Sequence, residues 1–254
     1  GVGRDYSGVV DATGEGVTDF TAGDAVLGTV RGAPGLGMTS GSLAEELVVP
    51  ADWVVHKPDA LGFTEAAALG VASQAAAGAL RTLGLSAGDA IVISGASGGV
   101  GSLAVQLAVH RGATVIGIAG ERNLDYIRSL GATAVAYGEG LEERVRAAAP
   151  APVTKLLDCH GPQYVDLALE LGLDPAAIAT IVPAPPSIAK GARATGGRDA
   201  RPREDLRGVA GLVADGAVRV TVARVRSFDL DAVREAYTEL RGGHVRGKLV
   251  IEMA

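Results

Sequence analysis

The sequence predicts an α/β protein in which a doubly wound parallel sheet is combined with a smaller β-barrel domain or part of one. Between residues 90 and 182, short apolar runs alternate with helical segments, the βαβ pattern of a parallel sheet covered by helices. Residues 7–58 show short β-like runs separated by glycine turns instead, as in a barrel. After residue 217 the pattern is strand, helix, strand, and we expect these elements to return to the barrel.

The barrel segment is predicted from its turn signals. We expect strands at 7–12, 25–30 and 43–50. The alanine-rich stretch that follows is predicted to form one helix from Thr64, with Thr64-Glu65 as its cap, to about residue 83. In the last part of the chain we expect a helix at 203–215, a strand at 218–225, a helix at 230–240 and a strand at 248–252.

The parallel sheet is predicted from five runs that are apolar nearly throughout, as in strands buried on both faces. These runs are 90–94, 114–118, 132–136, 155–158 and 177–182. The helices between them are expected at 99–111, 123–130, 141–148 and 163–171. Residues 183–202 lack periodicity and carry Lys190, Arg193, Arg198 and Arg201, so we expect a long, solvated surface loop there.

Composition excludes several classes of function. The 254 residues are 48% hydrophobic and 20% charged, which is typical of a globular protein. With 23 basic and 29 acidic residues the formal charge is −6, which disfavours nucleic acid or an anionic membrane as the partner. The apolar stretch 66–80 is shorter than the roughly 20 residues of a membrane span.

The single cysteine, Cys159, permits neither an intrachain disulfide nor a four-cysteine zinc site. A reducing, cytoplasmic setting is therefore expected. The chain begins at Gly1 without a methionine or a secretion signal, and we expect that it could start partway through a longer protein.

A glycine-rich turn follows the first strand of the expected sheet and leads into a helix. Glycine permits a tight turn, close approach of the backbone to a pyrophosphate and close packing of helix on strand, and the helix N-terminus attracts phosphate. The alternative is a strand–helix connection that merely tolerates glycine; the βαβ pattern on both sides favours phosphate binding. The residues expected to hold the pyrophosphate are Gly95, Ala96, Ser97, Gly98, Gly99, Val100 and Gly101.

The end of the second strand bears on the choice between NAD and NADP. An acidic residue there would bind the ribose 2′-hydroxyl of NAD, but this strand ends in small residues, and Arg122 could accept a 2′-phosphate. Glu121 would repel that phosphate unless it turned away, and Arg122 could simply be a solvated residue. The expected adenosine-phosphate residues are Ala119, Gly120, Arg122 and Asn123.

Four motifs resemble the zinc-independent quinone oxidoreductase branch of the medium-chain dehydrogenase/reductases, across nearly the whole chain. They are Gly-Arg-Asp-Tyr-Ser-Gly-Val-Val at 3–10, Gly-Asp-Ala-Val at 23–26, the glycine turn with Val-Gln-Leu-Ala at 105–108, and His-Val-Arg-Gly-Lys-Leu-Val at 244–250. The resemblance implies a GroES-like catalytic domain, a Rossmann domain, NADPH as hydride donor, and reduction of a quinone or activated C=C (enone or enoyl) substrate without metal. We place the GroES-like domain at 1–62 and 224–254 and the Rossmann domain at 63–223. A homodimer joined through an edge strand of the nucleotide sheet is also implied.

The resemblance further places Tyr137 beside the adenine and Val182, Pro183 and Ala184 along the nicotinamide. No catalytic residue is identified; Tyr6 could donate a proton or hydrogen bond to substrate, although such a tyrosine is more often a packing residue. Cys159-His160 could suggest a metal pair or a nucleophile with its base, but adjacent residues on a strand point to opposite faces, which favours a strand end with a buried thiol.

The sequence also departs from the family. Zinc-dependent relatives have Gly-His-Glu where this chain has Gly3-Arg4-Asp5, and they need further cysteines. The family's first several dozen residues, including a segment that lines the nicotinamide pocket, have no counterpart before Gly1, so a fragment and a shortened relative both stay open. Polyketide enoylreductase domains usually carry Gly-Lys-Thr-Asp after the fifth strand, and its replacement by residues 180–186 predicts a free-standing enzyme.

The expected function is therefore hydride transfer from NADPH to a quinone or enone. The alternative is a nucleotide-binding relative without turnover, in which the missing front segment has removed the acceptor pocket and the protein serves regulation or assembly.

Overall fold

The computed structural model describes residues 2–30 and 41–253, and the chain divides into two compact units. Unit 1 comprises Gly1–Ser73 and Arg201–Ala254, and unit 2 comprises Gln74–Ala200. This division by contacts falls at other places than the domain boundaries expected after residues 62 and 223, which stay a prediction.

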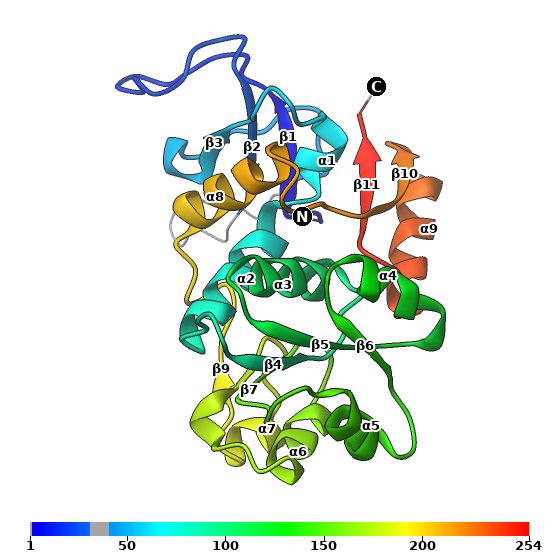
Figure 1. The fold of residues 1–254 in the computed structure, drawn as a ribbon. Coiled ribbons are helices and arrows are strands. Elements are labelled where there is room, and N and C mark those ends of the chain that lie inside the picture. Colours follow the sequence, from blue (N-terminus) through cyan, green and yellow to red (C-terminus); the bar gives the residue numbers. More distant parts are fainter. Residues whose placement is uncertain (1, 31–40, 254) are drawn as a thin grey trace. The chain divides into compact units, whose positions relative to one another are not determined.

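Unit 2 contains a parallel six-stranded sheet in the order β6-β5-β4-β7-β8-β9 (Figure 1). The strands are β4 (Ala90–Ile93), β5 (Thr114–Ala119), β6 (Thr133–Ala136), β7 (Lys155–Asp158), β8 (Ile178–Thr180) and β9 (Arg193–Ala194). From β4 the chain proceeds outward to β6, then returns to place β7 on the other side of β4. The strand order therefore reverses between β4 and β7, and in such sheets ligands bind outside the carboxyl ends of the strands at this point.

Helices connect these strands and bury their apolar faces on the sheet. They are α2 (Gly70–Thr82, which begins in unit 1), α3 (Gly99–His110), α4 (Leu124–Ser129), α5 (Leu141–Ala148), α6 (Gln163–Glu170) and α7 (Pro185–Ala189). One core cluster joins Ile116 and Leu156 of the sheet to Val145 of α5 and Val165 of α6, all with 0% exposure. Burying each such side chain contributes about 1.5–3 kcal/mol, which explains why continuous apolar runs form the strands.

Unit 1 combines an antiparallel sheet with a separate pair of parallel strands. The sheet has the order β1 (Asp5–Val9), β2 (Ala25–Thr29), β3 (Val54–His56), and the pair is β10 (Val222–Ser227) and β11 (Lys248–Glu252). Its helices are α1 (Phe63–Ala67), α8 (Pro202–Ala214) and α9 (Leu230–Arg241). A small core cluster contains Phe20, Val26 and Val54.

Asp5 ties three parts of unit 1 together. Its Oδ2 lies 2.8 Å from Lys248 Nζ on β11, and its Oδ1 accepts a hydrogen bond of 2.7 Å from the backbone N–H of Val71. A Cβ on Gly70 would lie 2.1 Å from Asp5 Oδ1, so glycine is required where α2 begins. The prediction of one helix from residue 64 to 83 was wrong in this respect, because the chain breaks between α1 and α2 to reach this carboxylate.

Two further predictions were wrong. Residues 43–50 contain no strand, and the third strand of the antiparallel sheet is Val54–His56; the backbone N–H groups of Ser42 and Leu43 bond instead to carbonyls of Gly3 and Val2 beside β1. The expected loop at 183–202 contains α7 and the edge strand β9, which has two residues and is too short to produce a periodic pattern.

The strand expected at 218–225 lies at Val222–Ser227, whereas the other predicted strands and helices are found within a few residues of their expected bounds. Among the described residues we find no helix with the length and apolar character that crossing a bilayer requires.

Candidate cofactor site

The sequence-predicted cofactor residues all follow the carboxyl ends of strands in unit 2. Because the strands are parallel, these ends share one edge of the sheet. The glycine turn (residues 95–101) follows β4, the residues 119–123 end β5, Tyr137 follows β6, and the loop at residues 182–184 follows β8. The structure thus brings these four groups to one edge. Tyr6 belongs to unit 1 and is treated separately.

The glycine turn is closed by backbone hydrogen bonds that only small residues allow. Ala96 N donates to Ile118 O at 3.0 Å, and Gly98 N donates to Gly95 O at 2.9 Å. Gly95 has a φ of +57°, which favours glycine. A Cβ on Gly101 would lie 2.2 Å from Gly95 O, so the first turn of α3 can pack on the strand end only without a side chain at this position.

The N-terminus of α3 points its backbone donors toward this turn. The first turn, at Gly99, Val100 and Gly101, carries no acidic side chain. The N–H groups in the first turn of a helix have no carbonyl partner within the helix. Ser102 N makes an ordinary helical bond to the carbonyl four residues earlier, Gly98 O, at 2.9 Å. Backbone N–H groups and the positive end of the helix dipole together suit a pyrophosphate, so the residues present fit this part of a dinucleotide.

The ends of β5 and β6 meet beside the glycine turn. Asn123 is buried and donates from Nδ2 to Ser97 Oγ at 3.2 Å, which joins the two loops. Tyr137 N donates to Ala119 O at 3.2 Å, and a Cβ on Gly120 would lie 3.4 Å from the Tyr137 ring. Glycine therefore lets the tyrosine ring lie against the end of β5.

Arg122 and its neighbour Glu121 are both exposed in the short 3-10 helix Glu121–Asn123. An exposed guanidinium at the tip of β5 can reach a ribose phosphate, but the nearby carboxylate is exposed as well. The choice between NADP and NAD at this position stays a prediction.

A cavity of about 440 Å³ opens beside Tyr137, whose side chain is 54% exposed. Leu141, Gln163 and Tyr164 line it together with three glutamates. Arg144 holds the loop that carries Tyr137, since its Nη2 donates to Ala136 O at 3.1 Å and to Gly138 O at 3.2 Å. The lining of this cavity thus combines two aromatic rings and two leucines with one amide and three carboxylates.

Sequence reasoning missed Asp158, which ends β7 and has 0% exposure. Its Oδ1 accepts hydrogen bonds from Ser94 Oγ at 2.7 Å and from the backbone N–H groups of His160 and Gly161 at 2.9 Å each. Its Oδ2 accepts a bond of 2.7 Å from Thr180 Oγ1. The available signal was a charged residue closing an otherwise apolar strand, because a buried carboxylate requires partners.

The neighbouring Cys159 and His160 do not form a nucleophile and base. Burial, and secondarily the Asp158 carboxylate, raise the pKa of the Cys159 thiol, which keeps it protonated. The His160 ring packs edge-on to Tyr164, with ring centroids 5.8 Å apart. Within the described ranges, no group of three or more His, Cys, Asp or Glu is placed to hold a metal, and independence of metal stays a prediction.

Tyr6 packs within unit 1. It lies opposite Gly28 in the register of β1 and β2, and a Cβ on Gly28 would lie 2.2 Å from its hydroxyl. The hydroxyl donates to Trp53 O at 3.5 Å. These contacts give the ring a packing role, and its action as a proton donor stays a prediction.

Two family models match the chain. The alcohol dehydrogenase GroES-like domain matches residues 1–59, and the zinc-binding dehydrogenase domain matches residues 99–181. Among curated proteins, dehydrogenase azaJ of Aspergillus niger is 30% identical over 283 aligned residues, covering 99% of this chain and 82% of that protein. The 2-methylene-furan-3-one reductase of Solanum lycopersicum is 31% identical over 255 residues, covering 98% of this chain and 62% of that protein.

Among solved structures, the quinone oxidoreductase of Coxiella burnetii is 31% identical with a TM-score of 0.83, covering 100% of this chain and 80% of that one. The chain covers less than two thirds of several curated relatives, for instance 38%, 4% and 62% of their lengths. These findings confirm the predicted α/β fold with a GroES-like and a Rossmann-like part. The protein belongs to the medium-chain dehydrogenase/reductases and is similar within them to the quinone oxidoreductases.

Proposed function

We propose that the protein is an NADPH-dependent oxidoreductase that reduces a quinone or an activated C=C bond without a metal. Membership of the family makes it an oxidoreductase of the nicotinamide-nucleotide type; the choice of NADPH and the acceptor class are our proposals. The observation that carries dinucleotide binding is the glycine turn between β4 and α3, whose donors lie where the strand order reverses. Arg122 supports the choice of NADPH, and the similar proteins support the acceptor class.

Each strand end then has a part in holding the cofactor. The glycine turn and the first turn of α3 bind the pyrophosphate, and Arg122 binds the 2′-phosphate. Tyr137 and its cavity receive the adenine, and the loop at 182–184 runs along the nicotinamide. When bound, the cofactor supplies a hydride; the protein orients it within roughly 3–3.5 Å of the acceptor carbon and excludes water.

The acceptor class is supported by two of the similar proteins. One is named a quinone oxidoreductase, and the other a reductase of a 2-methylene-furan-3-one, a conjugated ketone. Quinones and 2-methylene-furan-3-ones are both electron-poor conjugated carbonyl compounds, so the same hydride-transfer chemistry can reduce either of them. The proton that completes the reduction comes from solvent or from a side chain, for which Tyr6 stays the candidate.

Calorimetric titration with NADPH and NADH tests the cofactor, and a panel of quinones and enones tests turnover. We expect NADPH to bind more tightly than NADH. Arg122→Ala should weaken NADPH about tenfold, because a charge-assisted bond to phosphate is lost, and leave NADH unchanged. Arg128→Ala is the matched control, since Arg128 is an exposed arginine on the following helix that pairs with Asp125.

Preference for NADH, or an unchanged NADPH affinity in the Arg122 variant, would refute the cofactor proposal. Tight NADPH binding without oxidation by any acceptor would favour the non-catalytic alternative, a nucleotide-binding relative that serves regulation or assembly. The homodimer through an edge strand of the sheet is a further proposal; light scattering that shows only monomer would remove it. A cytoplasmic location stays a prediction.

A further inference from the structure

We propose that Asp158 is a positioning residue that sets the loop at residues 182–184 in register with the glycine turn. The inference rests on the proposed function, because it assigns the loop to the nicotinamide end of the cofactor and the turn to the pyrophosphate. Its basis is a chain of buried hydrogen bonds that connects the carboxyl ends of β4, β7 and β8.

Asp158 Oδ1 accepts the hydrogen bonds on the side of this network that faces the glycine turn. Ser94, which directly precedes the turn, donates its hydroxyl to Oδ1 at 2.7 Å and accepts a bond of 2.9 Å from Cys159 N. A Cβ on Gly95 would lie 3.1 Å from Cys159 O, so the turn and the segment after β7 are in close contact.

Asp158 Oδ2 holds the other side, next to the loop at 182–184. Thr180 donates its hydroxyl to Oδ2 at 2.7 Å, and Thr180 Oγ1 accepts a bond of 3.0 Å from the backbone N–H of Val182. Asp158 and Thr180 are register partners in β7 and β8, and Ile181 N donates to Asp158 O at 2.9 Å. The first residues of the loop are therefore fixed through one carboxylate.

The direction of the hydrogen bonds explains why a carboxylate is needed at position 158. Four donors converge on Asp158, and each of the two hydroxyls that donate to it also accepts a backbone N–H. An amide in place of the carboxylate has only one acceptor oxygen. With its oxygen kept among the three donors at Oδ1, its NH₂ group would face the Thr180 hydroxyl, which would lose its acceptor.

Stability alone gives little reason to bury such a network. Ser94, Asp158 and Thr180 each have 0% exposure, and a buried polar network is favourable only when every member is satisfied. Apolar residues at these strand ends would be buried without the free-energy cost of removing polar groups from water. What the network provides is a defined backbone position on both sides of the place where the strand order reverses.

The opposite edge of the same sheet offers a matched control. There Thr154 Oγ1 donates to Asp89 Oδ1 at 3.0 Å and accepts a bond of 3.2 Å from Ala90 N. This Thr–Asp pair lies before β4 and β7, away from the strand ends that carry the cofactor residues. Thr154 is exposed, and its hydroxyl also lies 3.2 Å from Ala90 O. Thr180→Val and Thr154→Val each remove one threonine hydroxyl that bonds an aspartate and a backbone N–H, and only Thr180 lies at the cofactor end of the sheet.

Two ligands distinguish a positioning role at the nicotinamide end from a general loss of nucleotide affinity. Calorimetry is done with NADPH and with 2′-phospho-ADP-ribose, which has all of NADPH except the nicotinamide ring. Thr180→Val should weaken NADPH about 5- to 30-fold, because the bonds of the hydroxyl to Asp158 and Val182 are both lost, and change the fragment less than about twofold. Asp158→Asn should show the same selectivity. Thr154→Val should change the affinity for neither ligand.

Hydrogen exchange in the protein without ligand tests the geometry directly. In Thr180→Val, the amide of Val182 should exchange faster than in the wild type, and in Thr154→Val it should not. Equal weakening of both ligands by Thr180→Val, equal effects of the two threonine variants, or unchanged exchange at Val182 would each overturn the proposal. If the wild type binds neither nucleotide, the proposed function fails as well, whereas normal NADPH binding with no selectivity in the variants refutes the positioning role alone.

Discussion

The parallel sheet of unit 2 and the β10–β11–α9 segment of unit 1 are stabilised in opposite ways. In the sheet, β4 and β8 are buried throughout and β7 nearly so, with Leu156 at 0% exposure. In the other segment, Val225 of β10 is 45% exposed and Leu230 of α9 is 65% exposed. Ala236 is the one described residue of α9 that is buried.

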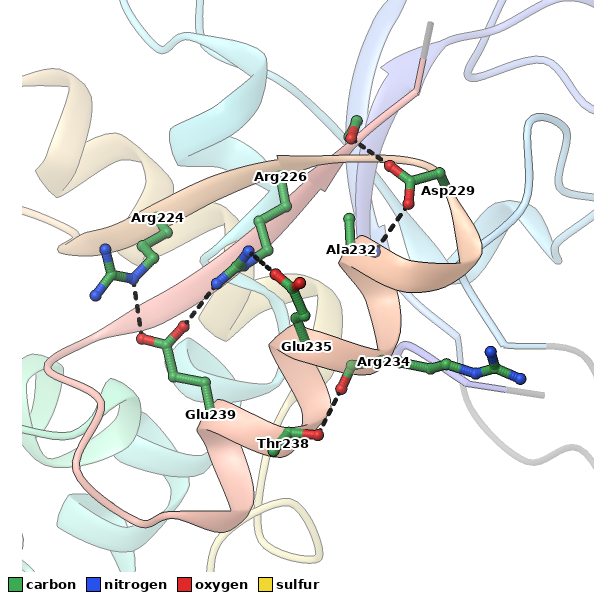
Figure 2. A network of polar contacts seen from close by, with 9 residues as sticks. Arg224, Arg226, Asp229, Ala232, Arg234, Glu235, Thr238 and Glu239 are labelled. Atoms are coloured by element: carbon green, nitrogen blue, oxygen red, sulfur yellow. Dashed lines mark hydrogen bonds and ion pairs between the residues drawn. The ribbon is translucent and has the colours of Figure 1, made fainter.

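Figure 2 shows the network of polar contacts between β10 and α9 in that segment. Arg226 pairs with Glu235 at 2.8 Å and with Glu239 at 3.2 Å, and Glu239 also pairs with Arg224 at 3.0 Å. Asp229 caps α9 by accepting a bond of 2.8 Å from Ala232 N. Exposed ion pairs of this kind contribute little and are screened by salt. The comparison teaches that unit 2 should respond to changes of packing and this segment to changes of charge.

The largest effect is expected from a cavity in the sheet. Leu156→Ala should destabilise unit 2 by about 2–5 kcal/mol, because a fully buried side chain is removed. Val225→Ala, at a half-exposed position on β10, should change stability by less than about 0.5 kcal/mol. Denaturant unfolding followed by hydrogen exchange, which resolves the two units, measures both. Similar losses in the two variants would contradict the contrast.

A smaller effect is expected from the glycine turn. Gly101→Ala should weaken nucleotide binding at least about tenfold, since its Cβ would lie 2.2 Å from Gly95 O and the turn must open. Gly208→Ala is the control: a Cβ there meets no atom within 4 Å, and an alanine inside α8 should stabilise it by about 0.5–1 kcal/mol. Calorimetry and thermal unfolding test the pair, and intact binding by Gly101→Ala would count against the turn as the phosphate site.

Acid should loosen α9. Hydrogen bonds from Arg224 and Arg226 lower the pKa of Glu239, and the bond from Ala232 N lowers that of Asp229. A lowered pKa in the folded state means that the contribution is complete above the ordinary values of 4.5 and 3.8 and is lost as the pH falls through the lowered values. The protection factors of the α9 amides, which correct for the intrinsic slowing of exchange in acid, should therefore fall as the pH falls from 6 toward 3, and Glu239→Gln should reduce that dependence. A flat pH response in the wild type would refute this.

The smallest effect is expected from salt. At about 1 M NaCl the screening length is about 3 Å, so the pairs of Arg224 and Arg226 should weaken slightly. We expect exchange in α9 to rise modestly between low and high salt while exchange in β4 and β7 stays constant. The same change in both places would show that the charges are not what distinguishes them.

The same contrast explains how much of the fold could be predicted. The buried strands β4 to β8 and helices α3 to α6 were found from the sequence because burial on both faces imposes continuous apolar runs. The two-residue strand β9 and the break between α1 and α2 were not, because each depends on a distant partner: β8 for β9, and Asp5 for the start of α2. Residues 43–50 have a β-like composition but pair with no strand in the part of the chain that the structure describes.

The candidate site divides in a similar way. The glycine turn could be recognised because its chemistry lies in consecutive residues. The role of Asp158 could not, since it depends on hydroxyls 64 and 22 positions away along the chain. The reactive side chains of Cys159 and His160 suggest a site in the sequence, whereas the residue that organises the strand ends is Asp158, immediately before them.

The ion pair between Asp5 and Lys248 spans 243 positions and has a consequence for the order of folding during synthesis. Unit 2 is one continuous stretch of chain, so it can form as soon as it leaves the ribosome. Unit 1 is complete only after β11 has been translated, because Lys248, the ionic partner of Asp5, lies on that strand. The nascent chain is therefore expected to complete the parallel sheet of unit 2 before it completes unit 1.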